Sequence, residues 1–161
     1  MVFFRQFSFL MYMLFFVNLQ VSGQDYFLRD KGPFDPSIPS PEAFLGYPIG
    51  EAHTRHDQIN AYFTKLAERS NRASITTYGK THEHRKLVML TVSNPGNLQN
   101  LPALKQQHLN FVDPNNTATN YNEIPIFVNL GYNVHGNEPS SSEAAMLVAY
   151  TLVASNSPCL L

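Results

Sequence analysis

The sequence lacks several features that would point to particular classes of protein. It has one cysteine, Cys159, which excludes a disulfide framework within the chain, although this thiol could equally be half of a pair whose partner is missing. Charged residues make up only 14% of the chain and the formal net charge is −1. This balance indicates neither a nucleic acid nor an anionic membrane as a partner. The sequence shows no internal repeat and no nucleotide-binding glycine fingerprint.

The first residues have the pattern of an export signal. Arg5 supplies the positive charge, Phe7–Val17 is an apolar run of signal-peptide length, and small or tolerated residues follow up to Gly23. The run is short for a membrane-spanning helix, so a retained anchor is the less favoured alternative. We therefore expect a signal peptide over residues 1–23, a mature protein that begins at Gln24, and a secreted, periplasmic or extracellular location without stable membrane association.

The remaining 138 or so residues are enough for one domain at most. Residues 24–53 contain five prolines, which exclude a long helix or a central strand, so we expect an extended arm on the domain surface. A flexible linker is the alternative, but the arm has many aromatic side chains for a solvated tether. The aromatic residues that could anchor it are Phe27, Phe34, Phe44 and Tyr47.

The middle of the chain predicts one helix and two strands. Apolar residues at helical spacing predict an amphipathic helix over 55–70, with Asp57 as a candidate cap. Residues 73–78 and 87–92 predict strands, the second nearly all apolar and therefore central. A shorter helix is expected at 101–109. The residues that make up the apolar face of the first helix are Ile59, Tyr62, Phe63 and Leu66.

The most informative stretch predicts a buried strand, a sharp polar corner and then a helix. The strand is expected at 124–130, where β-branched and aromatic residues cluster, and Gly131 ends it. The helix is expected to begin near Pro139, with Ser140 and Glu143 in the spacing of a capping box. The corner between them therefore lies at the carboxyl end of a strand, where open α/β sheets form their sites.

This corner carries a histidine and a carboxylate three residues apart, His135 and Glu138. Imidazole nitrogen and carboxylate oxygen are ligands that Zn²⁺ accepts, and a catalytic zinc keeps three protein ligands and a water. Gly136 would let the backbone turn tightly between the two. The alternative is a polar loop in which Glu138 or Ser140 only caps a helix. The strand-corner-helix context favours the metal.

The run Gly131–Pro139, followed by a helix that begins with small residues, resembles the first zinc motif of the M14 metallocarboxypeptidases. The loop Gly79–Arg85 is similar to a second family pattern, except that the family usually has glycine where this chain has His84. The resemblance implies zinc bound by His135 and Glu138, and peptide or protein C-termini as substrates. It also implies a further histidine ligand and a general-base glutamate beyond the end of this chain, so no catalytic residue is assigned. Asn137 places the chain nearer the variants that have His-Gly-Asn-Glu.

The other histidines are interpreted as surface residues. His82 and His84 share a face if they lie on a strand and could bind a metal, but an exposed hairpin loop is favoured. His53, His56 and His108 have no recognisable partners in the sequence. Residues 115–117 match an N-glycosylation sequon, which has meaning only in a eukaryotic host.

The helix that begins at residue 140 is apolar on nearly every face, and little sequence follows that could bury it. We therefore expect residues 54–161 to be a truncated, N-terminal part of a three-layer α/β/α sandwich with a mixed sheet. The resemblance implies a secreted zinc-dependent carboxypeptidase, with this chain inactive alone. Two alternatives are a zinc deacylase of the aspartoacylase-like kind and a non-catalytic secreted domain of the same fold.

Overall fold

A computed structural model of the chain describes residues 23–116 and 124–158. The chain divides into two compact units, Met1–Asp30 and Lys31–Leu161. In the first, α2 (Gly23–Leu28) is followed by Arg29, whose guanidinium lies 5.9 Å from the ring centre of Tyr26. Of the predicted signal peptide, residues 1–23, all but Gly23 lie outside the described residues. None of the helices within the described ranges is long and apolar enough to cross a membrane.

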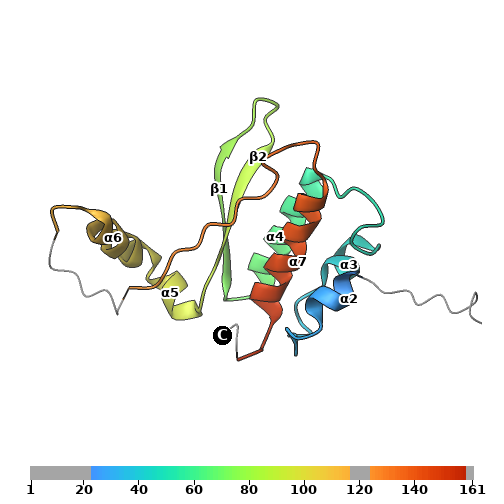
Figure 1. The fold of residues 1–161 in the computed structure, drawn as a ribbon, viewed down its shortest axis with the longest axis horizontal. Helices are drawn as coiled ribbons and strands as arrows, with labels where there is room; N and C mark the ends of the chain where they lie inside the picture. Colours follow the sequence, from blue (N-terminus) through green and yellow to red (C-terminus); the bar gives the residue numbers. More distant parts are fainter. Residues whose placement is uncertain (1–22, 117–123, 159–161) are drawn as a thin grey trace, which may run out of the picture. The chain divides into compact units, whose positions relative to one another are not determined.

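The second unit contains an antiparallel hairpin, β1 (Ala73–Lys80) and β2 (Lys86–Val92), as the sequence predicts. Its register runs from Ala73 opposite Val92 to Lys80 opposite Lys86, with a shift between Thr77 and Gly79. Such a shift bends the strand and increases its twist. The hairpin is drawn in green in Figure 1.

Helix α4 (His56–Arg69) packs against both strands, because its apolar residues recur on one face. Tyr62 and Leu66 are fully buried. The start of the helix is capped differently from the prediction: Oε1 of the Gln58 side chain accepts from the Arg55 N–H, 3.2 Å away. Asp57 pairs instead with the Arg55 guanidinium at 2.9 Å, because that charged donor lies within its reach.

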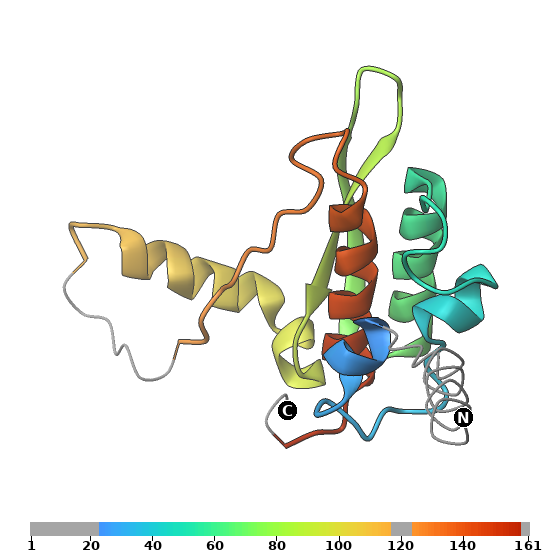
Figure 2. The same cartoon turned by 45° about the vertical axis from the view of Figure 1, so that its right-hand side comes forward.

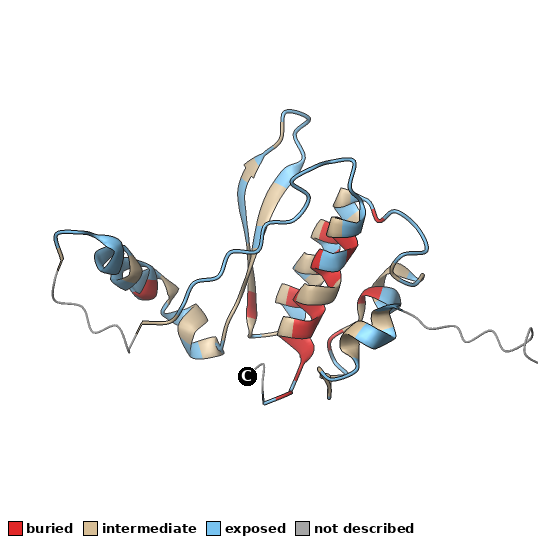
Figure 3. Ribbon diagram, viewed as in Figure 1, coloured by how far each residue is buried: buried red, intermediate tan, exposed pale blue. Residues whose placement is uncertain are grey.

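Helix α7 (Ser140–Ala154) packs beside α4, as both ribbon views show (Figures 1 and 2). Burial is concentrated on one side of α7, where Met146 and Ala154 are completely covered (Figure 3). On another side Ala144 is exposed, while Leu147 and Val148 are only partly covered. The apolar surface that the sequence predicts for this helix is therefore covered in part.

The segment 31–54, which includes α3 (Pro41–Leu45), lies along α7 and α4. Near its start, the Asp35 N–H donates to the Ala154 carbonyl at 2.7 Å, and the Phe34 ring stacks on Tyr150 at 4.9 Å. Further along, the Phe44 ring lies 5.2 Å from that of Tyr62. Phe34 and Phe44 are thus anchors, as predicted. Tyr47 is half-buried and hydrogen-bonds to Thr54, whereas Phe27 belongs to α2 of the first unit.

Two helices follow the hairpin, α5 (Pro95–Gln99) and α6 (Leu101–Val112), where the sequence predicts one. The predicted strand at 124–130 is wrong, because no residue of that run has strand structure. A strand needs a neighbour to satisfy its backbone groups, and the sheet pairs only β1 with β2 within the described ranges. The α/β class is confirmed. The hairpin, α4 and α7 pack together as the central elements of the fold.

Candidate metal site

The polar corner between residue 130 and α7 is held by its own backbone. The Glu138 N–H donates to the His135 carbonyl at 3.2 Å, and the Ser141 N–H donates to the Glu138 carbonyl at 3.4 Å. The Asn133 N–H donates to Ser141 Oγ at 2.8 Å, which ties the corner to the first turn of α7. Asn133, and not Gly136, has the left-handed backbone conformation, with φ of 56°. Asparagine tolerates this conformation better than most residues.

His135 and Glu138 face one another across this corner. His135 Nδ1 lies 3.1 Å from Glu138 Oε1. Two atoms bound to one tetrahedral zinc, each at about 2.0–2.1 Å, lie about 3.3 Å apart. The observed separation is that of a direct hydrogen bond between the two side chains, and it is also close to that of two ligands of one ion. Nitrogen from imidazole and oxygen from carboxylate is also a donor set that zinc accepts.

Both side chains are open to solvent, with 66% of the His135 side chain and 61% of the Glu138 side chain exposed. Solvent competes for an exposed ion pair, so their contact adds little to stability. The exposure leaves the two donor atoms accessible to an ion. A third ligand is not brought together with them: the described residues contain no cluster of three or more His, Cys, Asp or Glu that could hold a metal. The corner thus offers two donor atoms, whereas a catalytic zinc keeps three protein ligands.

Glu143 has a role that the sequence did not predict. Its carboxylate does not cap α7 as half of a capping box, because it reaches residues that lie far earlier in the chain. Oε2 accepts from the Gly50 N–H at 2.9 Å, and Oε1 accepts from the Thr54 N–H at 3.3 Å and from Thr54 Oγ1 at 3.0 Å. Glu143 is only 7% exposed. The sequence signal that could have identified it is a single charged residue in an otherwise uncharged, largely apolar helix.

The loop between β1 and β2 presents His82 and His84 to solvent, as predicted. His84 has a φ of 61°, a conformation that favours glycine. This explains why glycine suits the position, which is where the chain departs from the family pattern. The loop is closed by Thr81, whose N–H donates to the Arg85 carbonyl at 2.8 Å and whose carbonyl accepts from the His84 N–H at 2.9 Å.

Two of the remaining histidines are less exposed than the sequence indicated. His53 is exposed, but His56 is half-buried with Nε2 lying 3.4 Å from Asn60 Nδ2. His108 is half-buried against the ring of Phe127, 4.9 Å between ring centres. The sequence could not reveal the contact of His108 with Phe127, because Phe127 lies outside α6, whereas His56 and Asn60 lie one helical turn apart on α4.

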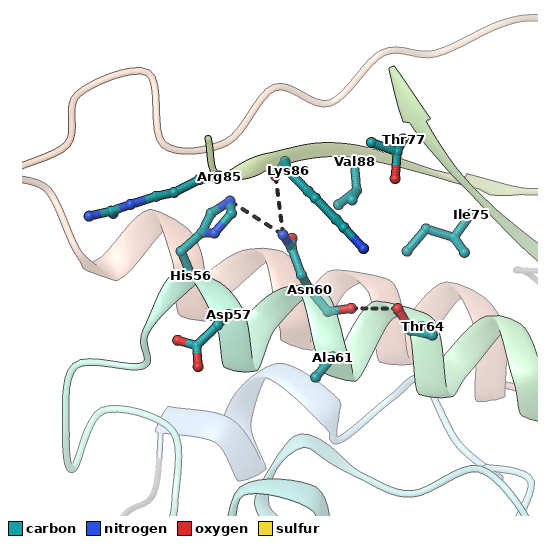
Figure 4. A pocket seen from close by; sticks show the side chains of 10 residues that line it. All are labelled: His56, Asp57, Asn60, Ala61, Thr64, Ile75, Thr77, Arg85, Lys86 and Val88. Atoms are coloured by element: carbon teal, nitrogen blue, oxygen red, sulfur yellow. Dashed lines mark hydrogen bonds between the residues drawn. The ribbon is translucent and has the colours of Figure 1, made fainter. Parts of the chain in front are cut away.

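A hollow of about 440 Å³ lies between α4 and the hairpin (Figure 4). The amide of Asn60 crosses it and donates to the Lys86 carbonyl at 3.2 Å. Its lining includes neither His135 nor Glu138, so the hollow is separate from the corner. The residues that line it are His56, Asp57, Asn60, Ala61, Thr64, Ile75, Thr77, Arg85, Lys86 and Val88.

Comparison with known proteins gives one match. The model of the Peptidase_M14 family, described as zinc carboxypeptidase, matches residues 59–158. The matched region contains α4 from residue 59 onward, the hairpin, the corner with His135 and Glu138, and all of α7. No curated protein and no solved structure gives a significant match.

Proposed function

Because the chain belongs to the zinc carboxypeptidase family, we propose that it is a secreted, zinc-dependent carboxypeptidase that removes C-terminal amino acids from peptides. The family match supports a function of the zinc carboxypeptidase kind. The proposal goes further in three respects: the residues that hold the metal, the export of the protein, and the release of C-terminal residues.

The observation that carries the proposal is the distance of 3.1 Å between His135 Nδ1 and Glu138 Oε1, inside the region that matches the family. In this proposal, Nδ1 of His135 and the carboxylate of Glu138 are two protein ligands of the zinc. A zinc ion bound in a catalytic site polarises the scissile carbonyl and lowers the pKa of a bound water.

The residues of the corner then have separate tasks. The imidazole of His135 must keep the Nδ1 lone pair free of a proton, so metal binding and protonation compete at this atom. Glu138 contributes negative charge that partly neutralises the ion. The bond from the Asn133 N–H to Ser141 Oγ fixes the path of the backbone that carries both ligands.

The export part of the proposal depends on the N-terminal sequence. The positive residue Arg5, the apolar run Phe7–Val17 and the small residues up to Gly23 have the order of a secretory signal. A peptidase that acts outside the cell would meet peptides and proteins with free C-termini, which is the substrate class proposed here.

The test compares variants of a full-length version of the protein, since this chain alone is expected to be inactive, for bound zinc and for release of C-terminal amino acids from peptides. Loss of a direct ligand should lower zinc affinity by more than about 100-fold, since loss of residues behind the ligands alone costs 10–100-fold. We therefore expect His135→Ala and Glu138→Ala to lose both zinc and activity, and His82→Ala to keep both. Loss of zinc in His82→Ala but not in His135→Ala would refute the site. Hydrolysis of N-acyl amino acids in place of peptides would support a deacylase instead.

A further inference from the structure

Glu143 is a buried carboxylate that the proposed zinc site does not use. It lies in the first turn of α7, is 7% exposed, and accepts hydrogen bonds from Gly50 and Thr54. Burial of a carboxylate is unfavourable unless hydrogen bonds replace the lost water, and here three donors do so. The positive end of the helix dipole also favours a negative charge in this turn.

The backbone before α4 is shaped to meet this carboxylate. Gly50 has a φ of 92°, a conformation that side chains disfavour, and its N–H points to Oε2 of Glu143. Thr54 is itself 7% exposed and gives both its N–H and its hydroxyl to Oε1. Both carboxylate oxygens are thus engaged by a segment 89 to 93 residues earlier in the chain.

The same turn of α7 is bonded to the zinc corner. Ser141, two residues before Glu143, accepts from the Asn133 N–H through its hydroxyl and donates its own N–H to the Glu138 carbonyl. A continuous set of contacts therefore leads from Thr54 through Glu143 and Ser141 to the residues that carry His135 and Glu138. A change in the position of this turn would change the position of the corner.

We propose that Glu143 is a positioning residue for the zinc corner: it fixes the first turn of α7 so that Glu138 stays opposite His135. This inference rests on the proposed zinc site. Glu143 is not itself a ligand, because both its oxygens are buried and occupied by donors of the 50–54 segment. It acts through the helix turn that it holds.

The test is a titration of the full chain with Zn²⁺, followed through the backbone amide NMR signals of residues 135–138, which remain observable in every variant and report the weak binding expected of two protein ligands. Glu143→Gln keeps the size of the side chain but replaces one acceptor oxygen by an NH₂ group that cannot accept. We expect this variant to bind zinc at His135 about 10-fold more weakly, at the lower end of the 10–100-fold range for residues behind a ligand. Thr54→Val removes one of the three hydrogen bonds to the Glu143 carboxylate and should weaken zinc binding by a smaller factor. It is the milder variant to use if Glu143→Gln does not fold.

Tyr62→Phe is the matched control for general loss of stability. It removes one buried hydrogen bond to the Pro39 carbonyl, away from the corner, and should leave zinc binding unchanged. If Glu143→Gln and Thr54→Val bind zinc as tightly as the unaltered chain while His135→Ala loses zinc, the role of Glu143 is overturned. The zinc site itself would stand. Equal weakening in Tyr62→Phe would also overturn it, because affinity would then follow stability alone. Unchanged binding in His135→Ala would refute the zinc site itself.

Discussion

Replacing Tyr62 by phenylalanine should destabilise the protein at neutral pH by an amount that falls to zero at alkaline pH. Tyr62 is fully buried on α4, and its hydroxyl donates to the Pro39 carbonyl at 3.0 Å. A hydrogen bond of this kind contributes about 0.5–1.5 kcal/mol net. At neutral pH we therefore expect Tyr62→Phe to unfold more easily by about 1 kcal/mol, which lowers Tm by about 2–4 °C for a chain of this size.

The pH dependence follows from burial of the phenol. Loss of solvent, with a smaller contribution from Tyr150, raises the pKa of Tyr62 well above its ordinary value. Below about pH 10 the phenol is neutral in both the folded and the unfolded chain, and its full contribution is present. Above that pH the unfolded chain releases the proton first, so the folded state loses about 1.4 kcal/mol per pH unit at this residue. The phenylalanine variant has no such loss, and the two stabilities should become equal near about pH 11.

The assay is denaturant-induced unfolding of both proteins between neutral pH and about pH 11. Tyr78→Phe is the control, since this tyrosine is 66% exposed and its replacement should change little at any pH. A difference between Tyr62→Phe and the unaltered chain that stays constant over this range would show that the phenol is not buried as described. It would refute the reasoning about the α4 core.

Three further predictions concern the hairpin loop, the apolar surface and export. His84→Gly should raise Tm by about 1–4 °C, because φ at this position is positive and glycine adopts such a conformation without strain. His82→Gly is the control and should not raise Tm, so equal effects of the two variants would contradict the loop conformation. The full chain should bind a hydrophobic dye strongly, because apolar side chains at 126–134 are exposed, and weak binding would mean that this run is covered in solution. N-terminal sequencing of the exported protein should begin close to Gln24, and a retained Met1 would refute cleavage after Gly23.

Local periodicity was enough to predict the parts of the fold that depend on neighbours in sequence. The spacing of Ile59, Tyr62 and Leu66 predicts the buried face of α4, and the structure confirms it. The two strands of the hairpin are found within two residues of their predicted ends. The two strands pair with each other across a short loop, and helical spacing marks the buried face of α4 whichever element covers it. Local pattern therefore contains most of the information for these elements.

The failures are of a different physical kind. The run 124–130 has strand composition, but a strand forms only where another strand pairs with it, and composition does not supply the partner. Glu143 has the spacing of a capping box with Ser140, yet its carboxylate bonds to Gly50 and Thr54 instead. Contacts across about 90 residues of chain cannot be deduced from local spacing.

The sequence predicted where the candidate site lies, but not the hydrogen bonds that hold it in place. The motif predicts that His135 and Glu138 lie together, and the structure places Nδ1 and Oε1 3.1 Å apart. Their role as zinc ligands stays a prediction. The bonds behind them, from Asn133 to Ser141 and from the 50–54 segment to Glu143, required the structure, because each joins residues with no shared motif.

The central claim is that zinc binds at the corner of His135 and Glu138. The most direct measurement is a crystal structure of the protein grown with zinc, with anomalous diffraction collected at the zinc absorption edge. We predict an anomalous peak within bonding distance, about 2.0–2.2 Å, of His135 Nδ1 and of the Glu138 carboxylate. A peak at His82 or His84 with none at the corner would contradict the account.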